Sequence, residues 1–214
     1  MTDGSQELDG LAGKILAAPR AGRRRVVALA GAPASGKSTL ADSLASQLNQ
    51  VGCQALVVPM DGFHLDNRIL SQRGILDRKG APESFDAAGL VHLCQRLVED
   101  DEVFYPLFDR QRDVSVAGAG LIHSNCDTVI VEGNYLLFDT PAWRPLAQYW
   151  DVAIQLAVSH VELRQRLIRR WLEHGLSMPE AVARAEGNDL QNAATLERHR
   201  LDVPGQIVLR NTQS

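Results

Sequence analysis

The sequence has few cysteines and no pattern that would join them. Its three cysteines, Cys53, Cys94 and Cys126, lie far apart and form no C-x-x-C pair. Their number is odd, so they cannot all pair within the chain. This pattern favours isolated thiols over a zinc site or a disulfide framework.

The sequence also lacks long apolar runs and a strong excess of one charge. No run approaches the roughly 20 apolar residues of a membrane span, and residues 1–10 are acidic and polar rather than a secretory leader. The chain carries 22 basic and 26 acidic residues, a net charge of −4. We therefore expect a soluble, cytoplasmic monomer or homodimer that binds neither membranes nor nucleic acid.

A phosphate-binding motif is the strongest signal that is present. Residues 31–39 read GAPASGKST and satisfy G-x-x-x-x-G-K-[ST]. A short apolar run at 26–30 precedes the motif, and leucines at helical spacing follow it over 40–48. Strand, glycine loop and helix in that order predict a nucleotide cradle. The predicted cradle comprises Gly31, Ala32, Pro33, Ala34, Ser35, Gly36, Lys37, Ser38 and Thr39.

The residue types in this cradle suit a chain of phosphates. Glycines let the backbone approach the anion, and the N–H groups at the start of the helix face it. Lys37 would reach the β- and γ-phosphates, and the Ser38 hydroxyl would take one position on Mg²⁺. A loop of this kind predicts nucleotide binding without specifying a reaction.

Strand and helix patterns alternate along the chain without internal repeats. This alternation predicts an α/β protein with the three-layer P-loop NTPase fold, a mainly parallel central sheet flanked by helices and a helical lid. Residues 1–22 would form an N-terminal helix packed on the core, and residues 23–214 one P-loop domain. The basic run at 23–25 is expected to be a solvated entry to the first strand.

Two charged segments and one arginine-rich helix could surround a second substrate. We expect loops at about 61–86 and 104–120 and a lid at about 160–190. The helix predicted at 159–174 carries an apolar stripe, with Arg169 and Arg170 on the opposite face as candidate cations over the transferred phosphoryl group. An ordinary solvated helix face is the competing interpretation. Arg164 lies among the apolar positions and should be paired or turned toward the ligand.

Two acids end apolar strand patterns. Asp61 follows the run at 55–60 and Glu132 ends the run at 127–133, and the carboxyl ends of parallel strands line the ligand crevice of open α/β sheets. We predict Asp61 as the base that receives the proton of an acceptor hydroxyl, with Lys37 stabilising the phosphates. Ser38 and Glu132 would serve Mg²⁺. In the alternative, Asp61 binds the metal and Glu132 is the base.

Four successive motifs resemble those of the phosphoribulokinase, uridine kinase and bacterial pantothenate kinase superfamily. They are the P-loop, MDGFH at 60–64, RKGAPESFD at 78–86 and VEGN at 131–134. The likeness covers about 24–210 and is nearest to small bacterial kinases linked to fructose transport. It implies a kinase that uses ATP and Mg²⁺ and phosphorylates a hydroxyl of a small metabolite. The candidate acceptor contacts are His64, Lys79, Tyr105, Arg110, Arg112, Asn134 and Tyr135.

The identity of the acceptor stays open at this stage. A sugar such as fructose is the leading prediction, with pantothenate or a nucleoside such as uridine as alternatives. The 104–112 segment lacks the Y-S-H type pattern of pantothenate kinases, and the chain is much shorter than theirs. A nucleotide-dependent regulatory NTPase is the second alternative, although the N-K-x-D guanine-recognition motif is missing.

Overall fold

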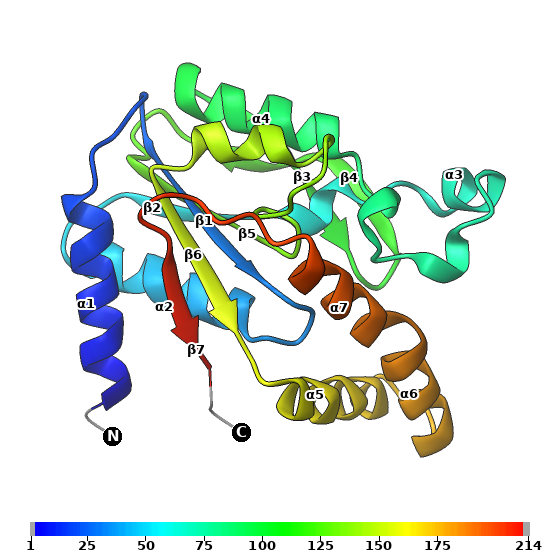
Figure 1. The fold of residues 1–214 in the computed structure, drawn as a ribbon. Coiled ribbons are helices and arrows are strands. Elements are labelled where there is room, and N and C mark those ends of the chain that lie inside the picture. The colour runs from blue at the N-terminus through cyan, green and yellow to red at the C-terminus, as the bar shows by residue number, and fades with distance from the viewer. Residues whose placement is uncertain (1–2, 212–214) are drawn as a thin grey trace.

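The computed structural model describes residues 3–211, so Met1, Thr2 and residues 212–214 lie outside the description. A five-stranded sheet runs through the described part in the order β2-β5-β1-β6-β7, and all its pairings are parallel (Figure 1). The α/β fold class predicted from the sequence is confirmed. The strands are β1 (Arg25–Gly31), β2 (Ala55–Pro59), β5 (Thr128–Gly133), β6 (Val152–Ala157) and β7 (Ile207–Arg210).

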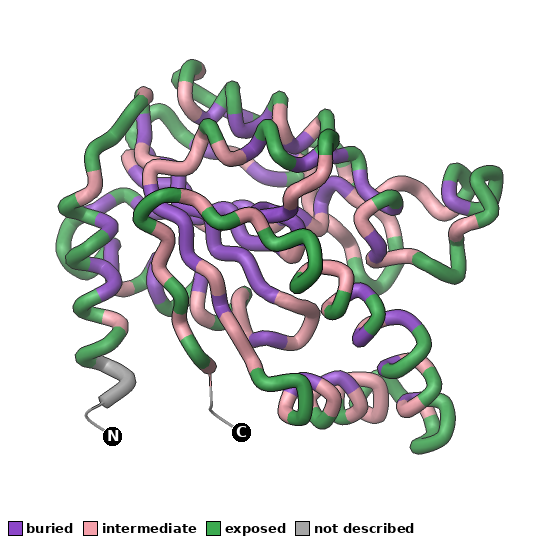
Figure 2. Tube along the Cα trace, in the orientation of Figure 1, coloured by how far each residue is buried: buried purple, intermediate pink, exposed green. Residues whose placement is uncertain are grey.

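Helices cover both faces of this sheet. α1 (Asp3–Ala17) and α2 (Lys37–Gln50) lie on one face, and α4 (Ala87–Glu99) lies with the 3₁₀ helix η4 (Arg144–Tyr149) on the other (Figure 1). Side chains of a strand alternate between faces: Val27 and Leu29 pack under α1 and α2, whereas Val26 and Ala28 pack toward α4. Since both faces are buried (Figure 2), β1 reads as one continuous apolar run.

The N-terminal helix packs on α2. Leu11 and Ile15 are buried against the sheet's α2 face, whereas Leu16 is 42% exposed. None of the described helices is both long and apolar enough to cross a membrane.

The segment predicted as a loop at 104–120 is instead an antiparallel hairpin. Strands β3 (Val103–Asp109) and β4 (Val114–Ile122) form a separate two-stranded sheet. The glycine- and alanine-rich sequence of β4 hides the strand pattern. Gly120 has a packing reason, since a Cβ there would lie 2.3 Å from the Tyr105 ring. The other predicted loop also contains a short helix, α3 (Asn67–Gln72).

Three helices form the lid region that Figure 1 shows beside the carboxyl edge of the sheet. They are α5 (His160–Glu173), α6 (Met178–Arg184) and α7 (Leu190–Arg198), with the π-helical turn η5 (Ala185–Asp189) between the last two. Ser177 and Glu180 form a capping box at the start of α6. Leu163, Leu167, Ala185 and Leu190 give this region a small core of its own.

The prediction of a solvated basic run at 23–25 is wrong for its central residue. Arg24 is fully buried, and its guanidinium donates to the carbonyl oxygens of Leu97 at 2.9 Å and Asp101 at 2.8 Å. A buried guanidinium needs such acceptors for its several N–H groups. Arg24 therefore ties the start of β1 to the end of α4 instead of facing solvent.

Candidate active site

Three strand ends meet at one edge of the sheet. Because β2, β5 and β1 are neighbours, Glu132 on β5 is paired with Pro59 on β2 and Leu29 on β1. The loops that leave these strands therefore converge. They border a cleft of about 560 Å³, whose other walls come from the hairpin and the lid helices.

The P-loop has the backbone of a phosphate cradle. Gly36 has φ 91° and caps α2 without any side-chain hydrogen bond, so the first N–H groups of the helix are not satisfied by a cap. Glycine is also required for space, since a Cβ on Gly31 would lie 2.6 Å from Ser35 Oγ. The loop is held from outside, because Ser35 O accepts hydrogen bonds from Arg166 Nη1 at 3.1 Å and Asn211 Nδ2 at 2.8 Å.

Glu132 is buried beneath this loop, and Lys37, of opposite charge, is partly buried. Burial lowers the pKa of Lys37, while the charges of Glu132 and Asp61 oppose that shift. Burial raises the pKa of Glu132 despite Lys37 and a hydrogen bond from Ser38. Glu132 is 5% exposed, and its Oε2 has no hydrogen-bond partner. An orphaned carboxylate oxygen beside a hydroxyl suits a hard cation.

The residues fit Mg²⁺ bound together with phosphates. No group of three or more His, Cys, Asp or Glu side chains within residues 3–211 could form an all-protein metal site. Magnesium keeps several waters and is usually held by one or two protein oxygens plus substrate phosphates. Ser38 and Glu132 supply oxygens of that kind, so they are the residues that would hold the ion.

Asp61 lies in the 3₁₀ helix η1 (Met60–Phe63), directly after β2, and lines the cleft. Its Oδ2 accepts a hydrogen bond from Arg110 Nη2 at 3.2 Å. The hairpin packs tightly against η1, because a Cβ on Gly62 would lie 2.0 Å from Pro106 O. Glycine in the D-G-F-H segment therefore permits the contact that brings Arg110 to Asp61.

The His64 ring is held next to this acid by a hydrogen bond and by aromatic contacts. Its Nδ1 lies 2.8 Å from Asp61 O, and since a carbonyl can only accept, Nδ1 carries the proton. Burial lowers the pKa of the ring, more than the Asp61 charge raises it. The ring lies 4.0 Å from the Phe85 ring and 4.8 Å from the Phe108 ring.

Lys79 forms the wall of the cleft on the acceptor side. Its Nζ donates to Asp113 Oδ1 at 2.8 Å and to Asn67 Oδ1 at 2.7 Å, and lies 5.1 Å from the centre of the Phe108 ring. The loop that the sequence predicted around the acceptor is thus tied to the hairpin.

Seven predicted site residues do not line the cleft, and three of them, Gly31, Ala32 and Ser35, belong to the P-loop. The other four come from elsewhere in the chain. Tyr105 and Tyr135 are buried beneath it, where their hydroxyls donate to Val57 O at 3.3 Å and Gly80 O at 2.7 Å. Arg112 is exposed and lies 3.9 Å from Asp109. Arg169 is exposed on α5. The two tyrosines therefore support the walls, and the direct contacts predicted for these four residues are corrected.

The remaining predicted residues do meet at the cleft. Lys37, Ser38, Asp61 and Glu132 line it, together with His64, Lys79, Arg110, Asn134 and Arg170. Arg164 is paired, as expected, with Glu186 at 2.6 Å. Several further lining residues were not predicted, because they come from capping turns, an apolar stripe and a hairpin corner. They are Phe108, Asp113, Trp171, His174, Arg184, Asp189 and Asn192.

A second pocket of about 530 Å³ adjoins the P-loop on its other side. It shares Asn134 with the cleft and is bordered by Gly31, Ala32, the end of β6 and helix α7. Its position next to the cradle and its largely apolar lining suit the nucleoside end of a nucleotide.

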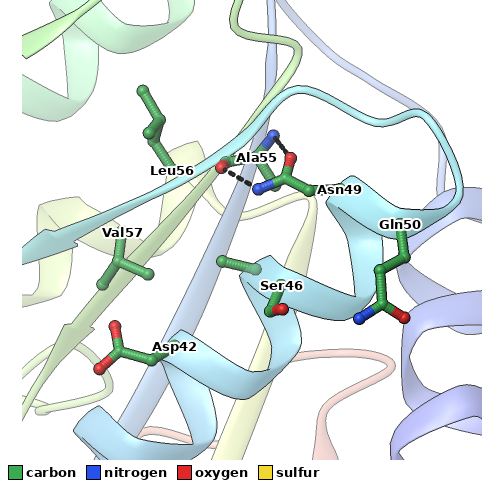
Figure 3. A pocket seen from close by; sticks show the side chains of 8 residues that line it. Asp42, Ser46, Asn49, Gln50, Ala55, Leu56 and Val57 are labelled. Carbon is green, nitrogen blue, oxygen red and sulfur yellow. Dashed lines mark hydrogen bonds between the residues drawn. The ribbon is translucent and has the colours of Figure 1, made fainter.

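A third pocket lies apart from all of these residues. Figure 3 shows it between α2 and β2, where Asn49 bonds Ala55 N at 2.7 Å and Ala55 O at 3.0 Å. Its volume of about 630 Å³ exceeds that of the cleft, yet it contains no P-loop residue and neither strand-end acid. We therefore place the active site in the cleft.

Comparison with known proteins points to one family. The model of the phosphoribulokinase/uridine kinase family matches residues 26–186. The crystal structure of a "putative fructose transport system kinase" from Silicibacter sp. TM1040 superposes with a TM-score of 0.90 at 52% identity, covering 94% of this chain and 98% of that one. The resemblance predicted from the sequence motifs is thereby confirmed.

Two curated relatives are also similar over most of their length. The uncharacterized protein YggC of Escherichia coli is 38% identical over 79% of this chain and 72% of its own. The "putative uridine kinase C227.14" of Schizosaccharomyces pombe is 33% identical over 88% of this chain and 83% of its own.

Proposed function

The chain belongs to the phosphoribulokinase/uridine kinase family and is a kinase, and on that premise we propose that it transfers the γ-phosphoryl group of ATP to a hydroxyl of a small sugar such as fructose. One observation carries the proposal: the P-loop lysine and the Asp61 carboxylate line the same cleft. Phosphoryl transfer consists mainly of positioning and charge stabilisation, which this arrangement provides.

Each end of the cleft has its own task in the reaction. The N–H groups at the start of α2 and the Lys37 ammonium bind the phosphates. Ser38 and Glu132 would hold Mg²⁺, which would neutralise negative charge on the phosphates. Asp61 accepts the proton of the attacking hydroxyl. The acceptor oxygen forms a bond to the γ-phosphorus, the bond to the bridging oxygen breaks, and ADP leaves.

Cations from two sides complete the electrostatics of transfer. Arg110 reaches Asp61 from the hairpin, and Arg170 lines the cleft from the lid. The hydrogen bond from Arg110 holds the Asp61 carboxylate at the cleft. Closure of the lid around the γ-phosphoryl group would exclude water and suppress idle hydrolysis.

The choice of a sugar rests on the relatives and on charge. The similar Silicibacter protein is named for a fructose transport system. Five basic and four acidic side chains line the cleft, a near balance before nucleotide binds, which gives no dominant attraction for a strongly anionic acceptor. A nucleoside is the second candidate, because the Schizosaccharomyces pombe relative is named as a uridine kinase.

The test is acceptor-stimulated ADP release with Mg·ATP. The panel should contain D-fructose and other hexoses and pentoses, uridine, cytidine and pantothenate. We expect a sugar to stimulate ADP release well above the acceptor-free rate and to yield a phosphate ester by ³¹P NMR. Stimulation by uridine alone would move the assignment to the nucleoside, and no stimulation by any compound would contradict the proposal.

A further inference from the structure

We propose that Asn192 on α7 determines which acceptors this kinase takes, by accepting a hydrogen bond from a second hydroxyl of the sugar. This inference rests on the proposed function and specifies the substrate class of the same site. Asn192 is 1% exposed and lines the cleft, yet its Oδ1 has no hydrogen-bond partner. A buried orphaned acceptor is costly and calls for a donor.

A short chain of amides fixes which polar atom of Asn192 is left without a partner. Asn188 Nδ2 donates to the carbonyl oxygen of Lys79 at 3.1 Å. A carbonyl can only accept, so the Asn188 amide cannot be reversed, and its Oδ1 is left to accept from Asn192 Nδ2 at 3.5 Å. Asn192 therefore presents its oxygen, not its nitrogen, as the unpaired group.

The buried side-chain oxygens without hydrogen-bond partners lie in different parts of the site. Four buried side-chain atoms of the described residues lack partners: Ser35 Oγ, Glu132 Oε2, Asn134 Oδ1 and Asn192 Oδ1. The first two lie at the phosphate and metal end. Asn134 lies where the cleft meets the second pocket, and Asn192 lies on α7. Both amide oxygens can bind only a group that donates a proton. Hydroxyls do so, whereas phosphate and carboxylate oxygens in their ionised forms do not.

The amide chain also couples recognition to the docked lid. Asn188 and Asn192 belong to η5 and α7, and Lys79 belongs to the acceptor loop, so Lys79 O fixes the orientation only when these segments meet. Gly80 adjoins the contact, where a Cβ would lie 3.9 Å from Asn192 Nδ2. A hydroxylated acceptor bound at Asn192 is thus held by both walls of the cleft.

The test compares Asn192→Leu with Gln191→Leu, a matched change at an exposed position one residue earlier. The probes are the best sugar of the panel and each of its monodeoxy analogues, with kcat/KM from ADP release. In the wild type, we expect one analogue, which lacks a hydroxyl away from the phosphorylated position, to have a kcat/KM roughly 5- to 100-fold below that of the parent sugar. In Asn192→Leu, kcat/KM for the parent sugar should fall by a similar factor, to the same value as kcat/KM for that analogue. Gln191→Leu should behave as the wild type.

Several outcomes would overturn the assignment. Unchanged discrimination in a folded Asn192→Leu, checked by circular dichroism, does so even if the kinase activity is real. If that variant does not fold, Asn192→Ala replaces it. A wild type that tolerates every monodeoxy analogue also overturns the assignment.

Calorimetry separates this inference from the proposed function. The same sugars are titrated into the protein saturated with Mg²⁺ and a non-hydrolysable ATP analogue. If the wild type binds a sugar without turning it over, and Asn192→Leu weakens that binding, the kinase proposal alone is contradicted. The role of Asn192 in binding a sugar hydroxyl would then stand. Absence of binding by every sugar contradicts both.

Discussion

The phosphate end and the acceptor end of the cleft are built in different ways. The phosphate end comes mainly from one continuous segment, residues 31–39, supported by Glu132. The acceptor end combines η1, the loop around Lys79, the hairpin, and helices α5 to α7. A local motif can therefore specify the first end, whereas only the folded chain specifies the second.

The two ends also differ in how their charged side chains are paired. At the phosphate end Glu132 Oε2 has no hydrogen-bond partner, which leaves it available to a ligand. At the acceptor end the charges are already paired, as in Lys79 with Asp113 and Arg110 with Asp61. The Arg110–Asp61 pair is partly exposed, and pairs of that kind contribute only about 0–1 kcal/mol, so an acceptor can replace it at little cost. This difference predicts tight, general nucleotide binding and adjustable acceptor binding.

The largest expected effect is at the phosphate end. Lys37→Ala should lower kcat/KM roughly 10³-fold or more, because it removes a buried charge that binds the phosphates. It should also weaken Mg·ATP binding. Steady-state kinetics and calorimetry measure both. A variant with nearly normal turnover would show that the cradle is not the site of catalysis.

Arg169 and Arg170 are neighbours on one helix, and their alanine variants should differ in kcat, with a smaller loss than that of Lys37→Ala. Arg170 lines the cleft, whereas Arg169 is exposed. We expect Arg170→Ala to reduce kcat roughly 10- to 100-fold through lost stabilisation of charge on the transferred group, and Arg169→Ala to stay within about twofold of the wild type. Equal losses in the two variants would mean that the lid acts by a different surface.

The acceptor end should respond mainly in the acceptor KM. Lys79→Met removes a cation that is 14% exposed in the cleft wall and should raise the acceptor KM roughly tenfold, with the KM for ATP nearly unchanged. Arg112→Met is the matched control, because Arg112 is 71% exposed outside the cleft. A rise in the KM for ATP in Lys79→Met would contradict the assignment of Lys79 to acceptor binding alone.

The smallest effect should appear far from both ends. Asp127 accepts hydrogen bonds from Cys53 Sγ, Gln54 N and Thr128 Oγ1 where β2 and β5 begin. Burial acts to raise the pKa of Asp127, but these bonds outweigh it and hold the pKa below its ordinary value.

Asp127→Asn should therefore lower the free energy of unfolding by about 1–2 kcal/mol at pH 7 without changing kcat. The contribution of the carboxylate is complete above about pH 4 and is lost as the pH falls through its folded pKa. Chemical denaturation at several pH values checks this, and the two proteins should converge in acid. A difference that persists at the lowest pH would rule out the carboxylate charge as its cause.

The sequence was informative where function is local. The P-loop, the strand-end acids Asp61 and Glu132, and the parallel sheet followed from periodicity and motif spacing. Tyr105 and Tyr135 were misplaced because a tyrosine in a loop motif reads the same whether its ring faces the ligand or the core. Arg24 was misplaced because its acceptors, Leu97 O and Asp101 O, are more than 70 residues away. Asn192 became visible only through its unpaired oxygen.

The most direct test of the central claim is the behaviour of Asp61→Asn. If its carboxylate receives the acceptor proton, kcat should fall roughly 10²-fold or more. The Kd for Mg²⁺ with a non-hydrolysable ATP analogue, measured by calorimetry beside Lys37→Ala, should stay within about threefold of the wild type. Loss of nucleotide binding as large as that of Lys37→Ala would instead place Asp61 on the metal and contradict its assignment as the base.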